Sequence, residues 1–70
     1  MSVSKKQKVS VLEKCVGDVE ILIYNQEIVL RVGKKVGDKD MEEKSKESMI
    51  KLEKMLDEYK IILKELKEGT

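Results

Sequence analysis

The 70-residue sequence predicts a single α+β domain, in which a three-stranded antiparallel β-meander is followed by one long C-terminal amphipathic helix (βββα). Three observations support this fold class. Short apolar runs in the first half are separated by turn-forming pairs, alternation places most apolar side chains on one face of the expected sheet, and the second half has helical spacing. The predicted elements are a flexible basic arm at 1–7, strands at about 8–16, 19–24 and 27–33, and a helix at about 40–68.

The first predicted hairpin is centred on Gly17 and Asp18, which stand between two apolar runs. A Gly-X pair is typical of a two-residue type II′ turn, whose first central residue has a positive φ. Residues 19–24 are apolar at nearly every position. Such a run is expected of a central strand that is covered on both faces, so we expect it to pair with the strand at 8–16.

The second predicted turn is at Asn25 and Gln26, because Asn tolerates the left-handed conformation that such turns require. The two turns together fix the register of the sheet. One face then carries Leu12, Val16, Val19, Ile21, Ile23, Ile28, Leu30 and Val32, with Lys14 as its only polar member. The opposite face is mixed, with Val11, Cys15, Leu22, Tyr24 and Val29 beside the charged Glu13, Glu20, Glu27 and Arg31. A slip of one residue would destroy this segregation, which favours the assignment.

The predicted helix has recognisable ends. Asp40 and Glu43 have the spacing of a capping box, and Gly69 is a natural stop. A stripe with alternating spacing of three and four residues contains Ser45, Ser48, Leu52, Met55, Tyr59, Ile62 and Leu66, and beside it Met49, Leu56 and Leu63 recur every seventh residue. We expect this broad apolar band to cover the apolar face of the sheet.

The length of this helix predicts an interface with a partner. A helix of residues 40–68 is about 42 Å long, whereas strands of six to eight residues span roughly 20–27 Å. The last turns of the helix should therefore extend beyond the sheet, unless the sheet is longer or the helix bends. The predicted partner interface is Met55, Tyr59, Ile62, Leu63 and Leu66. Antiparallel pairing of this helix in a homodimer is the simplest form of the interface, and pairing of the exposed sheet edges ranks second.

Composition excludes several classes of site. The chain has no histidine, and Cys15 is its only cysteine, so an intrachain disulfide and the common zinc sites are excluded. No apolar run approaches the roughly 20 residues of a membrane helix. The N-terminal residues lack an apolar signal core, and a lone cysteine fits a reducing compartment, so we expect a cytoplasmic protein. Fifteen basic and fourteen acidic residues give a net charge of +1, which is too balanced to indicate a polyanionic partner.

No combination of residues predicts catalysis, a cofactor or a small-molecule substrate. Cys15 lacks a histidine that could activate it, so we expect a small apolar side chain there and not a nucleophile. Gly33, Lys34 and Lys35 lack the upstream glycine of a phosphate-binding loop, and a valine follows the lysines. Adjacent carboxylates in so charged a helix are typical of a solvated face. We therefore predict no enzymatic activity and no metal site.

Nucleic-acid binding is the alternative function. In the predicted fold, basic residues lie where the chain enters the first strand and leaves the third, and they could form one patch. They are Lys5, Lys6, Lys8, Arg31, Lys34 and Lys35. Tyr24 is the only aromatic residue on the predicted sheet, so a stacking platform for single-stranded nucleic acid is poorly supplied.

The function that the sequence favours is protein–protein interaction. The apolar end of the predicted helix, the partly apolar second face of the sheet and the absence of chemical motifs suit a small subunit, adaptor or regulator. We expect it to form a homodimer or to join a larger complex.

Overall fold

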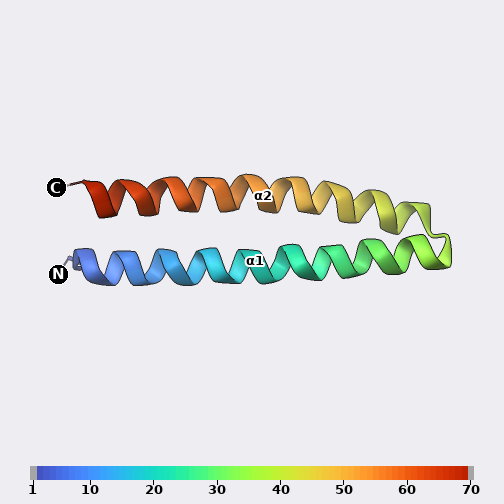
Figure 1. The fold of residues 1–70 in the computed structure, drawn as a ribbon, viewed down its shortest axis with the longest axis horizontal. Coiled ribbons are helices and arrows are strands. Elements are labelled where there is room, and N and C mark those ends of the chain that lie inside the picture. Colours follow the sequence, from blue (N-terminus) through green and yellow to red (C-terminus); the bar gives the residue numbers. More distant parts are fainter. Residues whose placement is uncertain (1, 70) are drawn as a thin grey trace.

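The protein is a helical hairpin. In the computed structural model, which describes residues 2–69, helix α1 runs from Lys5 to Val36 and helix α2 from Lys39 to Glu68. The two helices lie antiparallel along their whole length, with both chain ends at one end and the connection at the other (Figure 1). The hairpin measures 51 × 18 × 14 Å. We call the end with the connection the turn end and the other end the open end.

The predicted βββα fold was wrong. The described residues contain no strand, and the segments 8–16, 19–24 and 27–33, predicted as strands, all lie within α1. Residues 5–7 of the predicted flexible arm form the first turn of α1, and residue 1 lies outside the described residues. Helix α2 occupies the range in which a helix at about 40–68 was predicted. Since α1 has 32 residues and α2 has 30, the predicted overhang of the last helical turns is absent.

The two predicted β-turns are ordinary helical residues. Gly17 and Asp18, and likewise Asn25 and Gln26, continue α1 without interruption. The only residue with positive φ among those described is Gly37, at 74°. Apolar side chains recur at intervals of three and four residues from Val9 to Leu30, with Gln26 as the one polar member of the series. This is the helical period, and the long-range repeat overrides the local turn signals.

Specific caps fix the two ends of α1. Ser4 and Gln7 form a capping box, in which the Gln7 backbone N–H donates to Ser4 Oγ at 3.1 Å and the Ser4 N–H donates to Gln7 Oε1 at 3.0 Å. At the other end, Gly37 is left-handed and the Asp38 N–H donates to the Gly33 carbonyl at 2.9 Å. This arrangement is a Schellman ending, and it reverses the chain within two residues.

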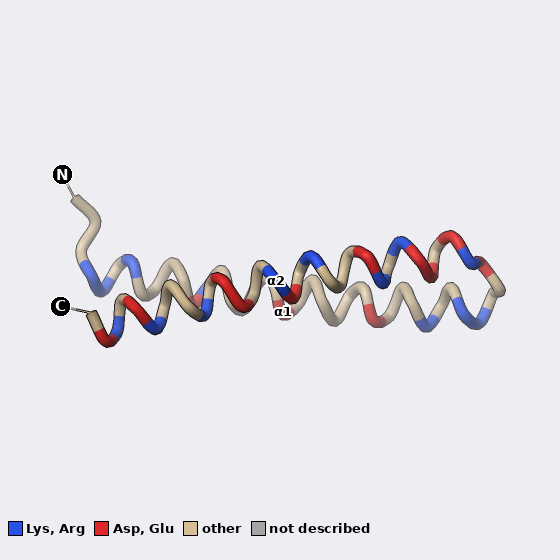
Figure 2. Tube along the Cα trace, turned by 90° about the horizontal axis from the view of Figure 1, so that it is seen from above, with Lys and Arg blue, Asp and Glu red and all other residues tan. Residues whose placement is uncertain are grey.

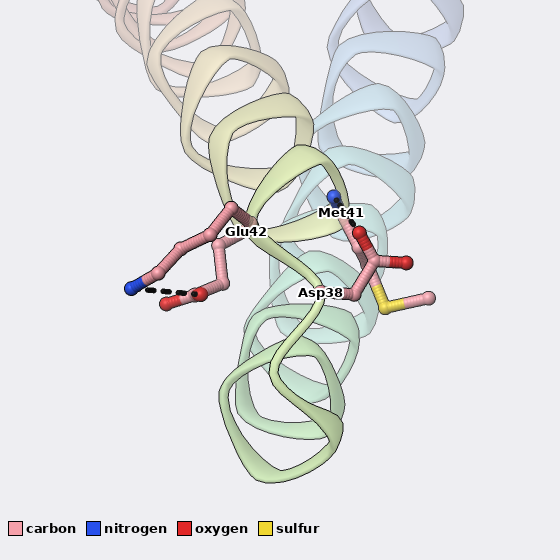
Figure 3. A network of polar contacts seen from close by, with 4 residues as sticks. Asp38, Met41 and Glu42 are labelled. Carbon is pink, nitrogen blue, oxygen red and sulfur yellow. Dashed lines mark hydrogen bonds and ion pairs between the residues drawn. The ribbon is translucent and has the colours of Figure 1, made fainter.

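Asp38 connects the two helices and starts α2. Its side-chain Oδ1 accepts a hydrogen bond from the Met41 N–H at 3.0 Å, whereas the sequence had suggested Asp40 as the cap (Figure 3). Asp40 and Glu42 add negative charge to the first turn, where the helix dipole favours it. Lys39 Nζ lies 3.8 Å from Glu42 Oε2 in the same turn.

A single seam of side chains holds the hairpin together. Each helix contributes residues at alternating intervals of three and four, which is the heptad pattern of a coiled coil. We define the seam as Val9, Leu12, Val16, Val19, Ile23, Gln26, Leu30 and Gly33 of α1, and Glu42, Ser45, Met49, Leu52, Leu56, Tyr59, Leu63 and Leu66 of α2. Only Val19, Gly33, Glu42 and Ser45 are buried, and the remaining seam residues are half-buried.

Small residues bring the helices close together at the turn end. A Cβ atom at Gly33 would lie 3.2 Å from Met41 Cγ and 3.3 Å from the backbone N of Glu42. Ser45 is 2% exposed in the same region. Glycine and serine therefore fill the positions at which a larger side chain would force the two helices apart.

Substitution of two glycines distinguishes the hairpin from the predicted meander. Gly17→Ala should stabilise the protein by about 0.5–1 kcal/mol, because alanine favours a helix and no atom lies within 4 Å of the new Cβ. Gly37→Ala should destabilise it by about 1–2 kcal/mol, because this residue is left-handed. Urea unfolding followed by circular dichroism measures both free energies. A loss of stability in Gly17→Ala would contradict a helical position 17 and would support a turn there.

Candidate interaction surface

The two sides of the seam differ sharply in polarity. In an antiparallel helix pair, each side of the seam is lined by one flanking position per heptad from each helix. On one side every such residue is charged. This charged flank comprises Lys6, Glu13, Glu20, Glu27 and Lys34 of α1, and Lys39, Lys46, Glu53, Lys60 and Lys67 of α2. Lys67 Nζ lies 3.8 Å from Glu13 Oε2 across it, and both side chains are more than half exposed, so this pair is worth less than about 1 kcal/mol.

The opposite side of the seam is apolar. We define the apolar face as Cys15, Leu22, Val29 and Val36 of α1 and Met41, Ser48, Met55 and Ile62 of α2, together with Val11, which lies beside this row. At the open end the corresponding position of α1 is Lys8, which is charged. Five of these side chains are exposed although they are large and hydrophobic: Val11, Leu22, Val36, Met55 and Ile62. Ile21, Ile28 and Val32 extend exposed apolar surface around α1 from this face. In Figure 2 the middle of α1 carries few charges, whereas charged residues follow α2 along its length.

Shallow hollows run along the apolar face between the helices. Near the turn end, one is lined by Val29 and Met41 with Ser45 and Ser48. The next is lined by Leu22, Leu52 and Met55 among others. A third, near the open end, is lined almost entirely by apolar atoms, which belong to Val3, Lys8, Val11, Leu12, Ile62 and Leu66. The face is therefore both apolar and grooved, which is the form into which side chains of a partner helix fit.

The structure divides the predicted partner interface between two surfaces. Met55 and Ile62 lie on the apolar face, and they are 43% and 37% exposed. Tyr59, Leu63 and Leu66 lie in the seam, where they are half-buried against α1. Their spacing reflects packing within the hairpin, because α1 provides the surface that the sheet had been expected to provide.

Residues of α1 were only partly anticipated in this surface. Val11, Cys15, Leu22 and Val29 were placed on the mixed face of the predicted sheet, and the structure brings them together on the apolar face with Val36. Tyr24, which had been grouped with them, lies on the other side of α1, because two residues correspond to about 200° around a helix. A repeat of seven from Cys15 through Leu22 and Val29 to Val36 was the sequence signal for this surface.

The basic residues of the alternative function are not brought together. Lys5, Lys6 and Lys8 lie in the first turn of α1 at the open end, whereas Arg31, Lys34 and Lys35 lie in its last turns at the turn end (Figure 2). About seven turns of helix separate the two groups, a distance near 40 Å. Lys5 Nζ also donates to the Gly69 carbonyl at 3.2 Å. Nucleic-acid binding stays a prediction, without the continuous patch that motivated it.

The described residues offer little chemistry of their own. Across residues 2–69, no group of three or more His, Cys, Asp or Glu side chains is placed to hold a metal ion. The hydroxyl of Ser45 is buried and has no hydrogen-bond partner within this part of the chain. A side-chain hydrogen bond to Asp40, at 3.0 Å, raises the pKa of Lys44 above its usual value, and both side chains are exposed.

Within residues 2–69, neither helix contains an apolar stretch long enough to cross a bilayer. Comparison with protein-family models, with curated proteins and with solved structures finds no match in any of the three.

Two alanine substitutions on α2 separate the seam from the apolar face. At low protein concentration, where intrachain packing dominates, Leu63→Ala should cost about 2 kcal/mol of unfolding free energy because it leaves a gap against α1. Met55→Ala should cost less than about 0.5 kcal/mol, because Met55 is exposed. Urea unfolding measures both values. Equal losses would contradict the division of the predicted interface.

Proposed function

We propose that the protein is a non-catalytic interaction module whose apolar face binds a helix or helices of a protein partner. The observation that carries this proposal is the one-sidedness of the hairpin. One side of its seam is fully charged, and the other exposes Leu22, Val36, Met55 and Ile62 along the whole length. Water-exposed apolar surface that is both continuous and grooved is typical of protein interaction sites.

The shape of the surface favours a helical partner. The hollows follow the groove between two antiparallel helices, and an amphipathic helix laid along such a groove buries side chains at intervals of three and four residues. A subunit, adaptor or regulator of a larger assembly would use the surface in this way. The single cysteine, half-buried on this face, is compatible with a reducing compartment, and we propose the cytoplasm.

Site-specific photo-crosslinking in cells that produce the protein tests the proposal. A benzophenone amino acid replacing Leu22 on the apolar face should yield covalent adducts with protein after irradiation. The same amino acid replacing Tyr24 is the matched control, because Tyr24 is more exposed than Leu22 (64% against 47%) but lies on the other side of α1. We expect adducts at least tenfold more abundant from position 22. Absence of adducts at position 22, or equal yields at both positions, would refute the proposed function.

A further inference from the structure

The hairpin exposes more surface than a compact chain of its mass. Its accessible surface is 5723 Å², and its mass is 8.1 kDa. A globular monomer of that mass exposes about 4,500 Å², so the excess is roughly 1,200 Å². A protein interface of standard size removes about 800 Å² from each partner. The excess is therefore large enough to supply one full interface, and the apolar face is where apolar surface is in excess.

The edge of the apolar face on α2 has an ordered pattern of charge. Beyond Met41, Ser48, Met55 and Ile62, the next position of each heptad along this edge is charged. These residues are Lys44, Lys51, Glu58 and Glu65. Both lysines lie in the half of α2 near the turn end and both glutamates in the half near the open end, so the sign of the charge along this edge changes near the middle of the helix.

Three of these four charges line hollows between the helices. Lys44 lines the hollow formed by Val29 and Met41, and Lys51 lines the hollow formed by Leu22 and Met55. Glu65 lines a hollow at the open end with Leu66 and Gly69 of the C-terminal part and Lys5 and Lys8 of α1. A partner seated on the apolar face therefore meets positive charge along one half of this edge and negative charge along the other.

A second copy of the chain carries the complementary pattern. We infer that the apolar face binds a second copy, related by a two-fold axis perpendicular to the helices, in a four-helix bundle with the two turns at opposite ends. In this arrangement α2 runs antiparallel to α2 of the partner subunit. Lys44 then lies opposite the partner's Glu65, and Lys51 lies opposite the partner's Glu58. The two-fold axis then passes near the middle of α2, where the sign of the charge changes. The two hairpins therefore overlap along their full length.

The other face-to-face arrangement lacks this complementarity. With both turns at the same end, α2 would lie on α1 of the partner subunit. Residues at equal distances from the turn would then meet, which places Glu58 near the partner's Asp18 and Lys51 near the partner's Asn25. The first pair repels and the second is not an ion pair, so charge selects the arrangement with the turns at opposite ends.

The intrachain contact of Lys44 is compatible with this pairing. Its ammonium group lies 3.0 Å from Asp40 Oδ2, and it has three N–H donors, so it can bond to Asp40 and to a carboxylate of the partner together. On α1, the corresponding edge reads Val11, Asp18, Asn25 and Val32. This row is apolar at both ends and polar in the middle. Antiparallel pairing of α1 with its copy therefore places Val11 opposite the partner's Val32 and Asp18 opposite the partner's Asn25.

Analytical ultracentrifugation of charge-reversed variants tests the inference, which rests on the proposed function of the apolar face. The wild-type chain should sediment as a dimer that dissociates on dilution. The variant with Lys44→Glu and Lys51→Glu, and the variant with Glu58→Lys and Glu65→Lys, should each dimerise at least tenfold more weakly. An equimolar mixture of the two variants should recover wild-type affinity as a heterodimer. The control variant carries Lys46→Glu and Lys60→Glu, has the same change in net charge on the charged flank, and should retain wild-type affinity.

A cysteine placed at the middle of α2 tests the geometry independently. In a Cys15→Ser background, Met55→Cys should form an interchain disulfide on mild oxidation, because position 55 lies next to its own copy beside the two-fold axis. Ser48→Cys should not, because its copy lies about four turns away along the axis of α2.

The outcomes separate the inference from the proposed function. A chain that stays monomeric at millimolar concentration would overturn the inference that the apolar face binds a second copy. Protein adducts from position 22 in cells would still support binding of another protein. A dimer whose affinity is unchanged by reversal of the four edge charges, or that crosslinks equally through positions 48 and 55, would overturn the arrangement proposed here.

Discussion

The packing of one helix against only one other helix is the constraint on which the rest of the structure depends. In a pair of helices, each seam side chain has neighbours on one side, so even the middle of the seam is thinly covered. Val19 is the only hydrophobic side chain among those described that is removed almost entirely from water, at 4% exposure. Everything that distinguishes the surface of the hairpin is arranged relative to this seam, with charged residues on one side and apolar residues on the other. The thin core also explains why additional burial against a partner would matter so much to such a chain.

The sequence contained correct information about α2 and misleading information about α1. Helical spacing, an acidic start and Gly69 placed the second helix close to its observed bounds. In the first half, β-branched residues and the pairs Gly17-Asp18 and Asn25-Gln26 resemble strands joined by tight turns. A strand assignment and a helix assignment compete there because many positions are apolar in both patterns. The apolar repeat of three and four residues favours the helix, since it continues through Gly17-Asp18 and resumes at Leu30 after one polar member, Gln26.

The same error determined what could be known of the interaction surface. Met55 and Ile62 were foreseen because they belong to a visible apolar band on α2. Tyr59, Leu63 and Leu66 were assigned to a partner because the surface that they contact, on α1, was not recognised as a helix of equal length. Leu22 and Val29 were predicted to lie together, on the mixed face of the sheet. That they lie beside Met41 and Met55 depends on the chain reversal at Gly37 and Asp38. Antiparallel proximity of this kind follows from the fold, and no local pattern in the sequence encodes it.

The distribution of side chains along the seam has a consequence for the order in which the hairpin forms. The layers next to the connection are small or polar, since Gly33 lies against Glu42 and Ser45 lies in the following layer. The layers richest in aliphatic carbon, such as those of Leu12 and Leu63, are near the chain ends. Closure near the turn therefore costs the least chain entropy but also gains the least from burial. The helices should not zip together progressively from the connection, and the rate-limiting step should instead be an encounter between the distant halves of α1 and α2.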